Sequence, residues 1–296
     1  MSDRLSEMET LNICNLCSSI DIEYADRENG IGICSKCGYI FNRERPTLAA
    51  ISEFYSKEDK YDQWIANEAE RDALWQRRLK LLLNYKKEGA LLDVGTGIGQ
   101  FLHFAKRHFD VSGTEVSTTA IEIAKEKYGL EILHGTIEKL HFTKTFDVIS
   151  LYHVLEHVSN PRTTVLSCHA LLKPSGYLII AVPNDVFGLY TWIVKLLSLF
   201  KFPGSADRGR MGLRRILLDG SQPEIHLSHF TVPVLRKFLE ANGFEVVKST
   251  LDQFYVESGW KKLVHYLIYR SCLWLNTFSG INIYFTMLVI ARKKAP

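Results

Sequence analysis

Several features that would place this chain in a special class are missing. Its 296 residues carry a net charge of only +3. This charge is too small to bind nucleic acid by electrostatic attraction, so we expect no nucleic-acid partner. There is no internal repeat and no low-complexity tract. The uncharged stretch 271–291 contains Asn276, Gly280 and Asn282, so we expect no membrane-spanning helix there. The first ten residues lack the apolar segment of a signal peptide, and we therefore expect a cytoplasmic protein.

Cysteine is scarce, and most of it falls into one pattern. Two Cys-x-x-Cys pairs, sixteen residues apart, consist of Cys14, Cys17, Cys34 and Cys37. This spacing is typical of a zinc ribbon in which four thiolates enclose one Zn²⁺ and leave no open position for catalysis. Disulfides are not expected in a reducing compartment. Cys168 and Cys272 lie on apolar helix faces, where we expect them to fill the core.

A glycine-rich turn organises the rest of the chain. The apolar run 90–94 predicts a short buried strand, and helical spacing begins after Gly99. Such a strand–turn–helix unit is typical of a doubly wound α/β sheet, which binds ligands beyond the carboxyl ends of its strands. A P-loop needs Gly-Lys-Ser/Thr, but Gln100 and Phe101 follow Gly99. The dinucleotide fingerprint needs a glycine at position 100, which is also absent.

Three motifs carry a resemblance to a known family. The Asp-x-Gly-x-Gly-x-Gly spacing from Asp93 to Gly99 resembles motif I of the class I S-adenosylmethionine-dependent methyltransferases. Phe-Asp-Val at 146–148 and His-x-Leu-Glu-His at 153–157 are similar to features of ubiquinone-type O-methyltransferases and sugar methyltransferases. The cysteine ribbon is similar to that of deoxysugar C-methyltransferases, which are longer and carry an extra C-terminal domain.

The resemblance implies a fold and a division of the chain. It implies an α/β fold, with a Rossmann-like seven-stranded sheet, helices on both faces, and an antiparallel pair of last strands (244–249 and 284–292) at one edge. We expect a zinc ribbon over 1–45 and a connector with a helix over 46–86. The methyltransferase domain is expected over 87–296, with a substrate-side insertion at 187–221. The connector, with Tyr55 and Tyr61, either packs between the domains or forms a lid over the cofactor.

The resemblance also implies S-adenosylmethionine as cofactor. Glu115 ends the second strand, where a carboxylate can accept hydrogen bonds from both ribose hydroxyls. The tip of the third strand lies beside the adenine in this family, so Thr136 or Ile137 could frame the ring. The full predicted cofactor set is Asp93, Gly95, Thr96, Gly97, Gly99, Glu115, Val116, Thr136, Ile137, Tyr152 and His153.

Histidines are the candidate catalytic residues. If a hydroxyl is methylated, a general base with a pKa near neutral helps, and histidine is the usual choice. His153 follows the fourth strand, and His226 and His229 precede a helix whose loop lines the acceptor pocket in the resembling family. His157 is a weaker candidate, and Glu156 is expected to point elsewhere on a helix, where it could cap the helix or pair with another side chain. His226 and His229 could be a metal pair, but no third ligand is evident; each histidine could also be structural.

The acceptor is the least determined feature. Residues 189–202 predict an amphipathic helix, and a basic run follows at Arg208, Arg210, Arg214 and Arg215. Three interpretations are open. The helix and the basic run could form a substrate lid whose charged edge faces solvent, they could bind an anionic acceptor such as a nucleotide-linked sugar, or they could make peripheral contact with an anionic membrane. Our first hypothesis is methylation of a small or carrier-linked sugar, and a quinone-like lipid is second. RNA or protein methylation and a non-catalytic cofactor-binding scaffold stay open, as does the atom methylated.

Overall fold

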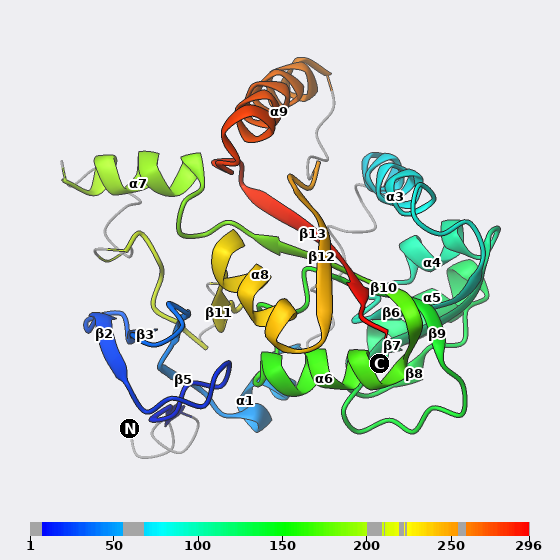
Figure 1. Cartoon of the computed structure of the whole chain (residues 1–296), viewed down its shortest axis with the longest axis horizontal. Helices are drawn as coiled ribbons and strands as arrows, with labels where there is room; N and C mark the ends of the chain where they lie inside the picture. The colour runs from blue at the N-terminus through cyan, green and yellow to red at the C-terminus, as the bar shows by residue number, and fades with distance from the viewer. Residues whose placement is uncertain are drawn as a thin grey trace.

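The computed structural model describes residues 8–55, 68–199, 209, 211–218, 222, 224–253 and 259–295. A seven-stranded sheet forms its centre (Figure 1). Across the sheet the strands are β12 (Phe244–Thr250), β13 (Thr286–Lys293), β10 (Leu172–Pro183), β9 (Phe146–Tyr152), β6 (Gly89–Val94), β7 (Phe109–Glu115) and β8 (Leu133–His134). The strands from β10 to β8 pair in parallel, and β13 runs antiparallel to both of its neighbours.

Helices cover both faces of this sheet, as the sequence predicted. One face packs on α6 (Pro161–Leu171) and α8 (Val232–Ala241), and the other on α3 (Glu68–Leu82), α4 (Gln100–Ala105) and α5 (Thr118–Tyr128). Successive side chains of a strand point to opposite faces, and accordingly Leu92 joins the first cluster while Leu91 joins the second. The predicted fold class is confirmed. The third parallel strand, β8, is short, because only Leu133 and His134 pair with β7.

Polar caps fix where the helices begin. The side chain of Ser117 accepts a hydrogen bond from the amide of Ala120, and Asn160 and Thr231 cap α6 and α8 in the same way. Proline at the first turn then starts both α6 and α8. These caps lie next to the carboxyl ends of the strands, so they place the connecting turns at that edge.

The N-terminal ribbon shares a core with the central sheet. Strands β2 (Ile22–Asp26), β3 (Ile31–Cys34) and β4 (Ile40–Asn42) form a sheet that is completed by β11 (Ser228–His229) from the far end of the chain. A smaller pair joins β1 (Met8–Thr10) to β5 (Glu44–Pro46). Tyr39 stacks on Phe41 and contacts the ring of Phe230. The ribbon is therefore built into the body of the protein and reaches the loop that contains His226 and His229.

The connector and the insertion pack against each other and against the ribbon. In α1 (Leu48–Tyr55), Ile51 and Phe54 contact Ile216 and Ile225. Leu213 packs on Ile31 of the ribbon. Of the predicted lid, Tyr61 lies outside the described residues and the side chain of Tyr55 is not described. Arg208 and Arg210 of the basic run also lie outside them, whereas Arg214 and Arg215 are exposed.

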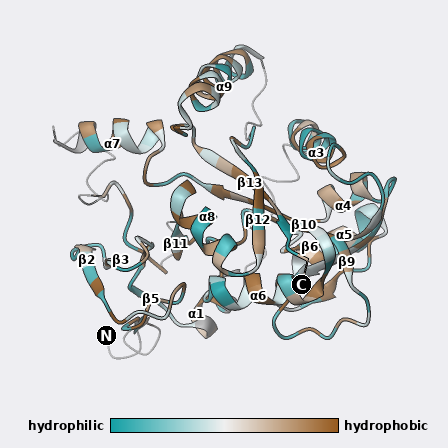
Figure 2. Cartoon of the chain, in the orientation of Figure 1, coloured by the Kyte–Doolittle hydropathy of each residue, from teal (hydrophilic) through white to brown (hydrophobic). Residues whose placement is uncertain are grey.

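Two helices project from the body with exposed apolar side chains. They are α7 (Leu189–Leu199) and α9 (Gly259–Ser279), which stand away from the sheet in Figure 1 and carry brown residues in Figure 2. Cys272 is the buried residue of α9, and Cys168 is buried in α6, so both fill the core as predicted. Among the described residues, no helix combines the length and the apolar character needed to cross a membrane.

Candidate functional site

The glycine loop follows β6 and closes against the turn after β9. Gly95 has a φ of 65°, and a Cβ built there would lie 2.7 Å from Cγ2 of Val154. At Gly99 (φ 81°) a Cβ would lie 2.8 Å from Cδ1 of Leu130. Both positions therefore require glycine for backbone conformation and for space. We call the loop 95–99 the glycine cradle; a side chain at Gly95 would fill the space beside the turn that begins at His153.

Two carboxylates hold this loop at the carboxyl edge of the sheet. Asp93 is buried in β6 and accepts a hydrogen bond from the hydroxyl of Ser150 at 2.6 Å. Burial raises the pKa of Asp93 to about 7, against the opposing effect of that hydrogen bond. Glu115, at the end of β7, accepts hydrogen bonds from the amides of Gly97 at 2.8 Å and Val116 at 2.8 Å. Glu115 thus links the ends of β6 and β7, and the predicted ribose contact would lie in the crevice that a doubly wound sheet forms beyond its strand ends.

The remaining predicted cofactor residues lie around this crevice with different exposures. Val116 is 41% exposed beside Glu115, which suits contact with a planar ring. Thr136 is half-buried at the tip of β8, whereas Ile137 is buried in the core, so Thr136 is the more accessible of the two. Tyr152 is buried at the end of β9 between Trp75 and Phe101. Thr96 lies within the glycine loop and is also buried.

His153 adopts an unusual backbone conformation at the end of β9. Its φ is 58°, a left-handed value that is uncommon outside glycine, and its amide is held by the carbonyl of Ala181 at 2.9 Å. Its Nε2 lies 3.6 Å from Oδ2 of Asp252, which also pairs with Arg78. Burial opposes a charged ring, but the carboxylates of Asp252 and Glu156 outweigh it and raise the pKa of His153.

Glu156 faces the histidines, contrary to the prediction that it points elsewhere on a helix. Residues 155–157 form a turn, and α6 begins only at Pro161, because Asn160 caps it there. One carboxylate oxygen of Glu156 lies 3.3 Å from Nδ1 of His153 and 3.8 Å from Nε2 of His157. The side chain is 1% exposed. The turn therefore directs a buried carboxylate into the space that the histidines surround.

Asp185 brings His226 and His229 together. Its Oδ2 lies 2.9 Å from Nδ1 of His226 and 3.1 Å from Nδ1 of His229. Burial opposes the charge on Asp185, but the two imidazoles outweigh it and lower the pKa of that carboxyl. The other nitrogen of His229 lies 3.1 Å from the side-chain amide of Asn42. Both ring nitrogens of His229 are thus engaged, whereas Nε2 of His226 faces Glu224 at 3.7 Å.

Sequence reasoning missed three residues of this site, namely Glu156, Asp185 and Asp252. Asp185 follows the fifth strand directly, and a carboxylate just past a parallel strand lies at the ligand-binding edge of the sheet. That signal was present in the sequence. Asp252 had no such signal. It follows the antiparallel edge strand β12, and only the folded chain places it beside His153 and Arg78 of α3.

The four ribbon cysteines converge as a metal site would require. The Sγ atoms of Cys14 and Cys37 are 3.8 Å apart, and those of Cys17 and Cys34 are 3.6 Å apart. All four sulfurs lie within 4.8 Å of one another. A tetrahedral zinc with bonds of about 2.3 Å places its sulfurs roughly 3.8 Å apart, whereas a disulfide needs about 2 Å. The arrangement fits one zinc ion.

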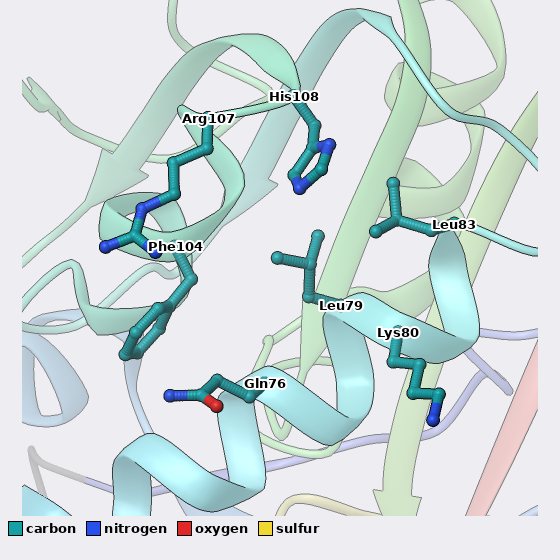
Figure 3. Close-up of a pocket in the computed structure, with 7 residues that line it drawn as sticks. All are labelled: Gln76, Leu79, Lys80, Leu83, Phe104, Arg107 and His108. Atoms are coloured by element: carbon teal, nitrogen blue, oxygen red, sulfur yellow. The ribbon is translucent and has the colours of Figure 1, made fainter.

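A cavity between α3 and α4 lies away from these residues. It measures about 220 Å³ and is lined by Gln76, Leu79, Lys80, Leu83, Phe104, Arg107 and His108 (Figure 3). Residues 106–108 lead into the start of β7, so the cavity is at the amino ends of the strands. Ligands of a doubly wound sheet bind at the opposite edge, and we do not assign this cavity to the site.

Comparison with known proteins agrees with this architecture. A ubiquinone biosynthesis O-methyltransferase of Haemophilus ducreyi is 35% identical over 116 residues, which cover 35% of this chain and 49% of that protein. The mitochondrial ubiquinone biosynthesis O-methyltransferase of Schizosaccharomyces pombe is 34% identical over 118 residues, covering 37% of this chain and 41% of that protein. The chain thus spans about half the length of the curated relatives it matches.

A solved structure and a family model extend the comparison. An S-adenosylmethionine-dependent methyltransferase from Thermotoga maritima matches 82% of this chain and 100% of its own, with a TM-score of 0.52 and 19% identity, which shows a shared fold. The family model of the methyltransferase domain matches residues 67–249, more than half of the chain. The glycine loop, Glu115 and the turn after β9 all lie within that range. This chain therefore belongs to the methyltransferase domain family.

Proposed function

We propose that this protein transfers the methyl group of S-adenosylmethionine to a hydroxyl of a small acceptor of the quinone-phenol type. The observation that carries the proposal is the closeness of Val154 to Gly95, where an added Cβ would lie 2.7 Å from Cγ2 of Val154, because it places the glycine cradle beside the turn that begins at His153. A methyl donor held in the cradle would lie next to a set of histidines and carboxylates. Membership in the methyltransferase domain family supports the same assignment.

The residues of the cradle fit the methyl donor. S-adenosylmethionine supplies an electrophilic methyl group on a sulfonium. Gly95 and Gly97 let the backbone approach the bound molecule, and the carboxylate of Glu115 can accept hydrogen bonds from its ribose. Val116, exposed at the crevice, offers an apolar surface to the adenine. The cradle therefore fixes the donor and leaves its methyl end toward His153.

The chain's own contribution to catalysis is to orient the acceptor and to take its proton. The acceptor oxygen must lie about 3 Å from the methyl carbon, in line with the bond to sulfur. As the oxygen–carbon bond forms, the carbon–sulfur bond breaks, its electron pair stays on sulfur, and the hydroxyl proton passes to a base. We assign that base to His153, because it lies at the end of β9 next to the cradle and the carboxylates of Asp252 and Glu156 stabilise the ring once it has taken the proton. His229 positions Asp185 instead.

The relatives favour one of the two acceptors that the sequence left open. A sugar was the first hypothesis and a quinone-like lipid the second. The curated relatives quoted above are named for ubiquinone biosynthesis, which supports the quinone-type acceptor. The exposed apolar residues of α7 and α9 also suit a protein that meets a lipid-like substrate.

We propose that α7 and α9 rest on an anionic membrane surface, where such an acceptor would be found. In α9, Trp260, Trp274 and Phe278 are 73%, 66% and 74% exposed. Lys261, Lys262 and Arg270 are exposed on the same helix. Exposed aromatic and basic side chains on one helix favour an interface of lipid headgroups. We further propose that the four ribbon cysteines hold one structural Zn²⁺.

The acceptor is tested with methyl-labelled S-adenosylmethionine and two substrates, a catechol with a prenyl tail and a nucleotide-linked sugar. We expect label in the catechol. Label confined to the sugar nucleotide would restore the first hypothesis from the sequence, and tight donor binding without any methyl transfer would indicate a scaffold.

Matched carboxylate variants test the cradle. Glu115→Ala removes the ribose contact, so we expect donor affinity measured by calorimetry to fall about tenfold or more. Glu131→Ala is the control, because Glu131 is 85% exposed and lies outside the crevice. Equal donor affinity in the two variants would contradict the assignment of Glu115.

A further inference from the structure

The cavity between α3 and α4 has an apolar floor. The amide of Leu83 donates to the carbonyl of Leu79 at 2.9 Å, which continues the helical turn and places both side chains on one face of α3. Phe104 of α4 lies across the space from Leu79 (Figure 3). The space measures about 220 Å³, which is less than the roughly 300–1,000 Å³ of a pocket for a drug-sized molecule. It therefore has room for a small apolar body such as a single ring.

The rim of this cavity is basic. Arg107 and His108 come from the turn that ends α4, where the amide of His108 donates to the carbonyl of Ala105 at 2.9 Å. Figure 3 shows both side chains on the side of the space opposite α3. Lys80 joins the rim from α3, and all three are exposed. Gln76 is uncharged, and among the described residues that line the cavity none is Asp or Glu.

Neighbouring charged groups are directed elsewhere. Asp110 is the carboxylate that follows His108 most closely in the sequence, and it lies 2.7 Å from Nζ of Lys144. The ammonium of Lys106, next to Arg107, donates to a backbone carbonyl at the end of α5 at 3.0 Å. A cleft with apolar walls and charges of one sign concentrates ions of the opposite sign. The cavity is therefore complementary to an anion that also carries apolar surface.

We propose that this cavity binds a small aromatic carboxylate. The ring would lie between Phe104 and the two leucines of α3, because aromatic rings pack well against rings and aliphatic side chains. The carboxylate would face Arg107 and His108, since a guanidinium binds a carboxylate through two parallel hydrogen bonds. Inorganic phosphate would leave the apolar floor in water, and a long acyl chain would exceed the volume. One ring with one negative charge uses both parts of the cavity.

The proposed site is separate from the glycine cradle and from the candidate catalytic histidines. It lies at the amino ends of the strands, but it shares α3 with the opposite edge. Arg78, the residue before Leu79, is buried and pairs with Asp252, which lies beside His153. An occupant packed between α3 and α4 would hold α3 in the position from which Arg78 reaches Asp252. A ligand that binds only the folded chain also raises its melting temperature.

Binding is tested on the full chain with neither methyl donor nor acceptor present. The probe is para-fluorobenzoate, followed by the line width of its fluorine NMR signal, and para-fluorobenzamide is the neutral analogue of the same shape. We expect one saturable benzoate site per chain with a Kd on the order of 1 mM and a higher melting temperature in its presence. The benzamide should bind at least tenfold more weakly, because it lacks the charge.

Two variants locate the probe. Arg107→Gln removes the cation, and Gln76→Trp, at an exposed position, fills the space without changing a charge. We expect each to weaken benzoate binding tenfold or more, whereas Lys106→Gln, which alters the neighbouring exposed cation, should bind like the parent. Circular dichroism identifies variants that unfold.

Three results would overturn the proposal. They are the absence of saturable benzoate binding, equal binding of the neutral benzamide, and undiminished binding in folded Arg107→Gln and Gln76→Trp proteins, which would place the probe elsewhere. Hexanoate and inorganic phosphate are added as competitors, and displacement of benzoate by either one at an equal concentration would overturn the aromatic part. Because the assay contains no methyl donor, failure of the proposed function would leave this result unchanged.

Discussion

The side-chain nitrogen of Asn42, in ribbon strand β4, lies 3.1 Å from Nε2 of His229. The same nitrogen donates to the carbonyl of His226 at 2.6 Å. Because Nδ1 of His229 contacts Asp185, one ring connects the ribbon to the carboxylate that orients His226. The ribbon thereby supports the loop of His226 and His229, which the proposed function places on the acceptor side.

Replacement of Asn42 tests this support. Asn42→Ala removes both donors and leaves buried acceptors unsatisfied, which we expect to lower the free energy of unfolding by about 1–3 kcal/mol. The KM for the acceptor should rise, while the Kd for S-adenosylmethionine stays close to that of the parent, since the cradle is untouched. Asn84→Ala, at an exposed position, is the control. A changed donor Kd with an unchanged acceptor KM would show that the coupling runs elsewhere.

Loss of zinc from the ribbon should disturb the contacts of Asn42 with His226 and His229, because Asn42 lies in ribbon strand β4. Cys34→Ser replaces one of four converging sulfurs, and we expect the zinc content to fall from one ribbon equivalent toward zero and the chain to melt at lower temperature. Cys272→Ala alters a buried cysteine outside the cluster and should keep its zinc. The assignment fails if the Cys34→Ser protein retains a full equivalent of ribbon zinc.

Two glycines with similar φ angles separate the cost of a left-handed backbone from the cost of a steric clash. Gly95 and Gly129 have φ values of 65° and 63°, but only at Gly95 would a Cβ meet a close neighbour, whereas at Gly129 nothing lies within 4 Å. Alanine should cost about 1–2 kcal/mol of stability at Gly129 through backbone conformation alone, and more at Gly95, where the Cβ also meets Val154. Only Gly95→Ala should also lose donor affinity, by tenfold or more in calorimetry. Similar donor affinities in the two variants would remove the glycine loop from the cofactor site.

The stability of the protein should depend on Asp147 in acid. Burial opposes its charge, but Lys173, the amide of Ala90 and Lys86 outweigh it and lower the pKa of Asp147 to about 2. The carboxylate therefore stabilises the fold above the unfolded pKa of about 3.9, and this stabilisation is lost as pH falls toward 2.

Denaturant titrations at several pH values measure this effect. The parent should exceed Asp147→Asn by about 2 kcal/mol at pH 7, and the difference should vanish near pH 2. Asp110→Asn is the control, because the pair of Asp110 with Lys144 is 70% and 43% exposed and should contribute little. A gap that is constant across this pH range would contradict the assigned pKa.

The membrane proposal predicts binding that depends on both lipid charge and apolar residues. The protein should sediment with anionic vesicles more than with neutral ones, and less so at high salt. Trp274→Ser with Phe278→Ser should reduce this binding, because each removes an exposed aromatic ring of α9. Leu166→Ser, 42% exposed on α6, should leave it unchanged. Equal binding to neutral vesicles would exclude the electrostatic part of the proposal.

Much of this protein follows from short-range patterns in its sequence. The two Cys-x-x-Cys pairs, the glycine loop after β6 and the caps of α5 and α8 depend on spacing and backbone conformation within a few residues. The alternation of Leu91 and Leu92 between the two faces also follows from the strand period. For this reason the sequence predicted the fold class, the cysteine cluster and a helix after His229.

The tertiary structure alone decided how the histidines and carboxylates of the candidate site come together. The pairing of β11 with β4, the contact of Asp185 with His226 and the approach of Asp252 to His153 join residues that are distant in sequence. Which strand ends meet depends on the order of the sheet and on how the ribbon packs, and no local pattern encodes either. Glu156 was misjudged because a capped turn, and not a helix, sets its direction. Its contacts with His153 and His157 follow from that local turn, whereas its approach to His226 exists only because the loop before α8 meets the strand ends in the folded chain.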